Sequence, residues 1–228
     1  MDFDYTIVRS RRRKTAAIHV GSEGVVVRVP VWVTDQWVAS FVASRSDWIS
    51  KHEQAVRENL QAHAITLKPG AMLPYMGDSF RLSWEKGRAR AVSRVADKIH
   101  VTIGGRSRKP ELEQVEACLK SWYRDQARTQ LQQRVEYWQQ VMGLRPKSLT
   151  VKSFRRRWGS CSAGGDIQLN WRLIFASQAL QDYVVIHELA HLVHLNHSPD
   201  FWQLVGEYCT EWKTKRKELQ NRTGWVLW

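Results

Sequence analysis

Two histidines four residues apart, with a glutamate directly after the first, are the side chains best suited to carry chemistry. They form the segment His187-Glu188-Leu189-Ala190-His191, an HExxH pattern. The segment lies in the apolar run 180–195, which predicts a buried helix. Because four residues make slightly more than one helical turn, both imidazoles project from one face and can bind the same metal ion.

Glu188 has a different position from the two histidines. It lies about 100° further round the helix than His187, so it falls beside a bound metal and not on it. From there it can accept a proton from a zinc-activated water and later deliver that proton to a leaving group. Two histidines and a glutamate in a buried stripe would lower stability if they had no functional role. We therefore predict Glu188 as the catalytic residue.

A zinc enzyme needs a third protein ligand and one open position. His197 follows His191 by six residues, and Ser198-Pro199-Asp200 predicts the cap and first turn of another helix. His197 thus lies at a corner between helices, where the chain can return a ligand to the metal. His194 is the alternative, but on a straight helix it lies about 4.5 Å beyond His191 along the axis. The predicted ligands of one zinc ion per chain, or of another divalent metal, are His187, His191 and His197.

The elements before this site predict a β-rich N-terminal lobe with a helical insert, covering residues 1–108. Thr15–Val20 and Gly24–Val29 flank a glycine-containing turn and predict a hairpin. Apolar residues then recur at helical spacing from Thr34, a candidate N-cap. The segment 104–110 is rich in glycine and charge and marks the boundary. Three further predicted strands precede it: Phe80–Trp84, Ala91–Val95 and Ile99–Ile103.

The remaining residues, 109–228, predict a lobe that holds the metal site. A long amphipathic helix runs from Glu111 to Met142. Ser148–Phe154 and Asp166–Trp171 predict a short antiparallel sheet, with Gly164-Gly165-Asp166 as its turn. The HExxH helix follows at about Ser177–Leu195, and a last helix at about Pro199–Gln220. The fold class is therefore α+β.

Several segments of the chain resemble the YgjP-like family of metal-dependent hydrolases. They are Arg157-Trp158-Gly159-Ser160-Cys161, Leu169-Asn170, the helix segment 183–191, Asn196-His197-Ser198 and Phe201-Trp202. The resemblance implies a zincin-like catalytic domain, similar to the SprT-like proteins. It also implies His187, His191 and His197 as ligands and Glu188 as acid and base. Related folds are peptidases, and proteins of this kind have also been described as nucleoside triphosphate pyrophosphatases.

The ligand spacing is also that of the metzincin proteases, HExxHxxGxxH. His194 occupies the glycine position of that pattern, however, and no methionine follows Met142. Since a metzincin requires a methionine turn after its zinc motif, the sequence excludes membership of that group.

Four residues are candidate substrate contacts: Arg157, Trp158, Asn170 and Arg172. Arg155 and Arg157 share one face of a predicted strand, and together with Arg172 they could form a phosphate clamp. The alternatives are a charged edge strand for Arg155 and Arg156, and a structural role for Asn170. Cys161 fits a small buried residue better than a nucleophile, because the metal already accounts for the histidines.

The overall charge favours anionic partners. The chain has 35 Lys and Arg against 22 Asp and Glu, a net charge of +13. The basic runs Arg9–Lys14 and Lys213–Lys217 could contact the phosphates of nucleic acid, or could simply be solvated surface. The three cysteines show no metal or disulfide spacing. No signal peptide or membrane span is evident, so a cytoplasmic location is expected. The oligomeric state is not indicated.

These observations predict a zinc-dependent hydrolase, with a metallopeptidase as the first choice. A nucleoside triphosphate pyrophosphatase using the same metal site is the alternative, because zinc polarises carbonyl and phosphoryl oxygens alike. A nucleic-acid-associated binding protein with a structural zinc is the non-enzyme alternative. It is disfavoured because three histidines leave an open position on the metal, unlike closed four-ligand sites.

Overall fold

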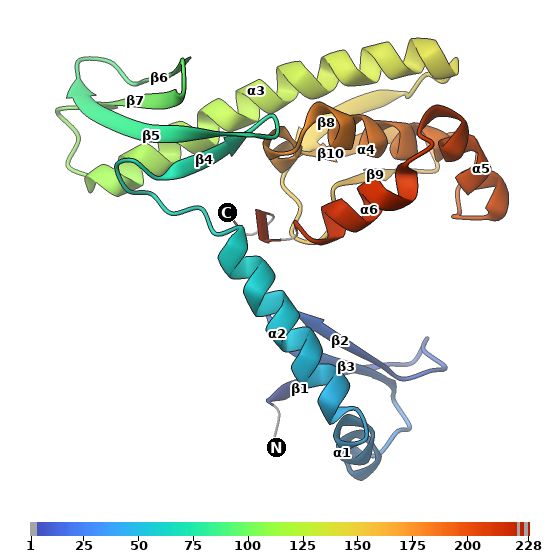
Figure 1. The fold of residues 1–228 in the computed structure, drawn as a ribbon. Helices are drawn as coiled ribbons and strands as arrows, with labels where there is room; N and C mark the ends of the chain where they lie inside the picture. The colour runs from blue at the N-terminus through green and yellow to red at the C-terminus, as the bar shows by residue number, and fades with distance from the viewer. Residues whose placement is uncertain (1–3, 223, 226–227) are drawn as a thin grey trace. The chain divides into compact units, whose positions relative to one another are not determined.

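The structure is a computed structural model and describes residues 4–222, 224–225 and 228. The chain divides into two compact units, one ending at Ala64 and the other beginning at Ile65 (Figure 1). The boundary that the sequence predicted between residues 108 and 109 lies instead between residues 64 and 65. The reason is that the strands after Ala64 share one core with the C-terminal helices, including Ile99 and Val101 with Val115.

The first unit combines a small sheet with two helices. Strands β1 (Tyr5–Ser10), β2 (Ala17–Gly21) and β3 (Gly24–Pro30) lie in the order β1-β3-β2. The antiparallel β2–β3 pair is the predicted hairpin, and β1 adds a parallel strand that the sequence pattern did not indicate. The helical insert is two helices, α1 (Asp35–Ala43) and α2 (Ser46–Ala62). Thr34 caps α1 as predicted, since its hydroxyl accepts a hydrogen bond from Trp37 N at 3.2 Å.

The second unit starts with a four-stranded sheet in the order β4-β5-β7-β6. Its strands are β4 (Met72–Tyr75), β5 (Asp78–Gly87), β6 (Ala91–Val95) and β7 (Lys98–Gly104). The buried residues of β7 alternate along the strand, so one face of the sheet is apolar. The long helix α3 (Glu111–Met142) covers that face and extends beyond it (Figure 1).

A third sheet lies at the other end of α3, and it is mixed. Its strands β8 (Ser148–Lys152), β9 (Gly159–Cys161) and β10 (Asp166–Asn170) lie in the order β8-β10-β9. β10 pairs antiparallel with β9 but parallel with β8. The α+β class is confirmed, while the predicted antiparallel pairing of 148–154 with 166–171 is wrong. The glycine turn at 164–165 joins β9 to β10 instead, because the three-residue β9 intervenes between the two longer strands.

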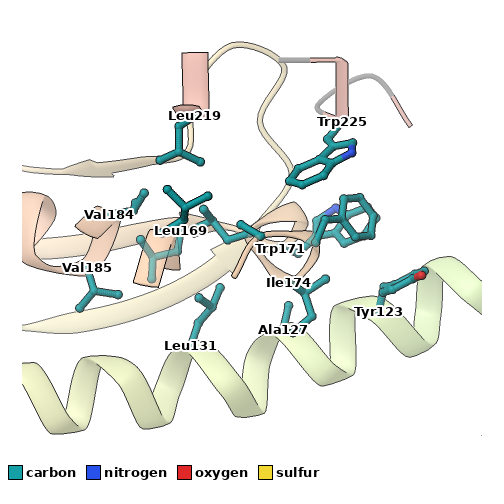
Figure 2. Packing of buried hydrophobic residues seen from close by; sticks show 14 of the residues in the cluster. Tyr123, Ala127, Leu131, Leu169, Trp171, Ile174, Val184, Val185, Leu219 and Trp225 are labelled. Carbon is teal, nitrogen blue, oxygen red and sulfur yellow. The ribbon is translucent and has the colours of Figure 1, made fainter. Parts of the chain in front are cut away.

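The core of this unit lies between α3 and the elements that carry the metal motif. Figure 2 shows Tyr123, Ala127 and Leu131 on the face of α3 that is turned toward this layer. Opposite them lie the buried side chains of β10, of the short 3-10 helix η1 (Trp171–Phe175) and of α4 (Gln178–Ala190). The motif helix α4 is therefore held in place by its packing in this core.

The C-terminal helices depart from the predicted bounds. α4 ends at Ala190, and residues 191–193 form a turn where the prediction extended the helix to Leu195. The predicted last helix is interrupted at Cys209–Glu211, giving α5 (Pro199–Tyr208) and α6 (Trp212–Gln220). Among the described residues, no helix is both long enough and apolar enough to cross a membrane.

Candidate metal centre

The three predicted ligand histidines lie together. His187 lies on α4, His191 caps its C-terminal end, and His197 lies in the corner before α5. One ring nitrogen from each lies within 4.8 Å of the other two, and Nε2 of His187 is 3.1 Å from Nε2 of His197. Nitrogens bound to tetrahedral zinc at 2.0–2.1 Å would lie roughly 3.3 Å apart. The donor set therefore fits a single divalent ion.

His194 contributes its backbone to the site. Nδ1 of His191 lies 2.9 Å from the carbonyl oxygen of His194, so Nδ1–H donates to this carbonyl. This hydrogen bond fixes the tautomer of His191 and leaves Nε2 as the free lone pair. Among the described residues, the group that could hold a metal includes His197 and not the His194 ring.

The environment keeps His187 neutral, which is the form of histidine that can bind a metal. Burial lowers the pKa of His187 to about 3, and the neighbouring His191, His197 and Arg216 add to the effect. The pKa of His197 is lowered by the same kinds of cause, burial first. A neutral imidazole presents a lone pair to a cation, so these histidines are ready to bind metal at neutral pH.

Aromatic rings hold the imidazoles in place. The centre of the Phe201 ring lies 4.5 Å from that of His191 and 4.9 Å from that of His187. The rings of His197 and Trp202 are stacked with their centres 5.5 Å apart. The Trp202 ring also stacks on Trp212, with 4.1 Å between the ring centres. Phe201 and Trp202 occupy these positions because Ser198 starts α5, with its hydroxyl accepting from Phe201 N at 3.3 Å.

Glu188 is buried beside the histidines, with only 4% of its surface exposed. Burial raises its pKa to about 8, against the opposing effect of the positive charge of Arg157. The carboxylate lies close to Gly159, the first residue of β9. A Cβ atom at Gly159 would lie 2.5 Å from Oε1 of Glu188, so only glycine allows the strand to come this close. Gly159 lies in the Arg157–Cys161 motif, but the sequence pattern did not indicate this role for it.

A cavity of about 480 Å³ opens over these residues. α4 contributes His187 and Glu188, the segment 156–159 forms one side, and α6 contributes Arg216. Arg216 was predicted only as part of the basic run 213–217. Its spacing from Trp212 and Leu219 places all three on one face of α6, which was the signal available in the sequence.

Two of the four predicted substrate contacts, Arg157 and Trp158, line this cavity. Asn170 does not, because its side chain is fully buried. Its Nδ2 donates to the carbonyl oxygens of Phe154 and Arg157, both at 3.1 Å. Its Oδ1 accepts from Arg172 N and caps η1. Asn170 therefore holds the segment that carries Arg157, which corresponds to the structural alternative.

Arg172 points elsewhere, so the suggested phosphate clamp with Arg157 does not form. Its guanidinium donates to the main-chain oxygen of Trp228, from Nε at 2.8 Å and also from Nη2, and lies over the Trp171 ring. Burial, helped by the charge of Arg124, lowers its pKa to about 10.

Cys161 and Arg155 also lie outside the cavity lining, whereas Arg156 belongs to it. The pKa of Cys161 is raised by burial first and then by the carboxylates of Glu188 and Asp166. A raised pKa disfavours the thiolate, so the surroundings of Cys161 do not suit a nucleophile.

The buried glutamate next to three convergent histidines, on a helix beneath a cavity, defines a metal-dependent hydrolase. The chain belongs to the YgjP-like family, because the model of that family's metallopeptidase domain matches residues 14–222. The crystal structure of the abylysin metallopeptidase zymogen from Pyrococcus abyssi is similar in part, with 21% identity and a TM-score of 0.37. The match covers 40% of this chain and 93% of that chain. No curated protein sequence matches this one.

Proposed function

We propose that this protein is a zinc-dependent peptidase in which Glu188 is the general base and then the general acid. The observation that carries the proposal is the burial of Glu188 beside His187, His191 and His197. A zinc ion held by these three histidines would supply Lewis acidity, polarising the scissile carbonyl and making water more acidic. The remaining steps belong to residues of the chain.

Glu188 is suited to move a proton in both directions. Its pKa of about 8 without a metal lies close to neutral pH, where a group can both accept and release a proton. The carboxylate form of Glu188 is favoured when positive charge is present at the neighbouring histidines. Glu188 then accepts the proton of the attacking water and donates it to the amine that leaves. Packing against Gly159 keeps the carboxylate at this position.

The geometry around β9 favours a peptide as substrate. β9 is at the edge of its sheet and pairs with β10 alone among the described strands. Its first residue, Gly159, contacts Glu188. An extended chain that adds to this free edge would pass directly over the catalytic glutamate, which is a common way to bind peptides.

The test is a substrate screen with metal-loaded wild-type protein and a Glu188→Gln control. The screen covers unstructured proteins of the casein type and all common nucleoside triphosphates. Proteolysis that depends on Glu188 supports the proposal. If pyrophosphate is released from a nucleotide and no protein is cleaved, the peptidase proposal is wrong.

That second outcome would support a nucleoside triphosphate pyrophosphatase. The observation in its favour is the number of arginines in the cavity lining, namely Arg156, Arg157 and Arg216. Guanidinium groups bind phosphates well, and the same metal chemistry serves phosphoryl oxygens. A purely structural zinc is the weaker alternative, because the cavity lies next to the three histidines and would leave an open position on the metal.

A further inference from the structure

We propose that Arg157 and Arg216 are carboxylate-binding residues on two sides of the metal centre, which select peptides with acidic residues flanking the scissile bond. This inference rests on the peptidase function proposed above and names its substrate class. Nothing in the family match assigns a role to either arginine.

Arg216 belongs to the histidine side of the cavity. Its guanidinium lies 5.1 Å from the centre of the Trp202 ring, and the same ring stacks on His197. Arg216 lines the same cavity as His187 and His197. It is therefore held by an aromatic surface at the histidine side of the cavity.

Arg157 belongs to the glutamate side of the cavity. Its guanidinium lies 4.6 Å from the centre of the Phe154 ring, and its charge opposes the effect of burial on the pKa of Glu188. Its backbone is fixed by the hydrogen bond from Asn170. The two arginines thus lie on either side of the groups that react, each resting on an aromatic ring.

Neither guanidinium has an ion-pair partner in the part of the chain that the structure describes. Within residues 4–222, 224–225 and 228, no carboxylate forms an ion pair or hydrogen bond with Arg157 or Arg216. The carboxylate in the cavity lining is Glu188, and the lining also includes Arg156, Arg157 and Arg216. Even with Glu188 ionised, the lining carries more positive than negative charge, and an anionic ligand would offset the difference.

The nature of the remaining lining favours an acidic peptide. Trp158, Val184 and Leu219 give the same cavity apolar surface. A glutamate or aspartate side chain offers an apolar stem and a carboxylate that pairs with a guanidinium in two parallel hydrogen bonds. A chain along the edge of β9 would place one flanking residue near Arg157 and the other near Arg216.

The experiment compares matched peptides that carry glutamate or glutamine on each side of a central bond. Binding is measured by fluorescence anisotropy with zinc-loaded Glu188→Gln protein. This measurement does not depend on turnover. Cleavage of the same peptides by the wild type is measured as kcat/KM. We expect glutamate to be preferred by roughly tenfold or more per site, the scale of one charged hydrogen bond, and the preference to shrink at high salt.

Variants show which arginine causes the preference for glutamate on each side of the scissile bond. Arg216→Gln and Arg157→Gln should each abolish the preference on one side and leave that on the other side intact. Arg216→Lys should retain part of the preference that Arg216→Gln abolishes. Lys217→Gln and Lys152→Gln are matched controls that should change nothing. Lys217 is the next residue on α6, and Lys152 lies over the same Phe154 ring as Arg157, but neither lines the cavity.

The outcomes separate the inference from the function on which it rests. If the glutamate and glutamine peptides are cleaved and bound equally well, the peptidase proposal stands and the arginine inference is wrong. If no peptide is cleaved but glutamate is still preferred in binding through both arginines, the carboxylate sites stand and the peptidase proposal fails. If only nucleoside triphosphates bind, in a manner that requires both arginines, the peptide inference is overturned.

Discussion

Gly159 and Glu188 are in direct contact, so that a side chain at position 159 would displace the carboxylate of Glu188. An added Cβ would lie 2.5 Å from Oε1, 2.8 Å from Cγ and 2.9 Å from Cδ of Glu188. The contact joins the edge strand β9 to the motif helix α4. It explains why the Trp-Gly-Ser-Cys segment and the HExxH segment must be considered as one site.

Gly159→Ala should therefore lower hydrolysis strongly while the metal stays bound. The methyl group requires Glu188 to move, and a misplaced general base loses on the order of a hundredfold in rate. Metal content and kcat/KM, measured on the same preparation, check this prediction. Gly164→Ala is the control, because a Cβ there meets no atom closer than 3.5 Å. Equal activity of the Gly159→Ala variant and the wild type would contradict the proposed contact.

His197→Ala should release the metal, whereas His194→Ala should retain it. Three ring nitrogens converge at the site, and His194 contributes a carbonyl oxygen that its alanine variant keeps. Zinc content after dialysis against a weak chelator is the measurement. The ligand assignment is wrong if only the His194 variant loses its metal.

Glu188→Gln should keep the metal and reduce turnover at least about a hundredfold, the scale of losing general acid and base catalysis. Glutamine has the same shape as glutamate, so the packing against Gly159 persists. Turnover is followed with whichever substrate the screen identifies, alongside metal analysis. Turnover close to that of the wild type would remove Glu188 from the mechanism.

The metal-free protein should lose stability as the pH rises, because Glu188 holds a proton more tightly in the folded protein than in the unfolded chain. Its pKa is about 8 in the folded state and 4.5 as its ordinary value, so the fold keeps a proton that the unfolded chain releases. The free energy of unfolding therefore falls between about pH 4.5 and pH 8, by at most roughly 5 kcal/mol from this group. Urea unfolding with chelator present, compared between wild type and Glu188→Gln, isolates the effect. A constant difference across this range would contradict it.

Asn170→Ala should destabilise the protein by roughly 2–4 kcal/mol. The side chain is fully buried and donates to two carbonyl oxygens, which the substitution leaves unpaired. Its second effect should be on Arg157, whose backbone it holds. Urea unfolding measures the first effect, and an unchanged free energy of unfolding would refute it.

Local patterns in the sequence were sufficient for those features that depend on neighbouring residues. The 3.6-residue period places His187 and His191 on one side of α4 and Glu188 beside them. Ser198 and Thr34 start helices because each hydroxyl accepts a hydrogen bond from an amide three residues later. The β2–β3 hairpin follows from its glycine turn. Zinc as the metal, a cytoplasmic location and binding to nucleic acid stay predictions.

Features that depend on the packing of distant segments were decided by the tertiary structure alone. Arg216 reaches the metal centre because α6 packs against α4, whereas Arg172 turns to Trp228 although it follows β10 in the site region. β8 and β10 are parallel because β9 takes the antiparallel edge. The unit boundary lies after Ala64 because the four-stranded sheet buries its apolar face on α3. Side-chain periodicity specifies which face of an element is apolar, but the partner of that face is set by the competition of all apolar surfaces for burial.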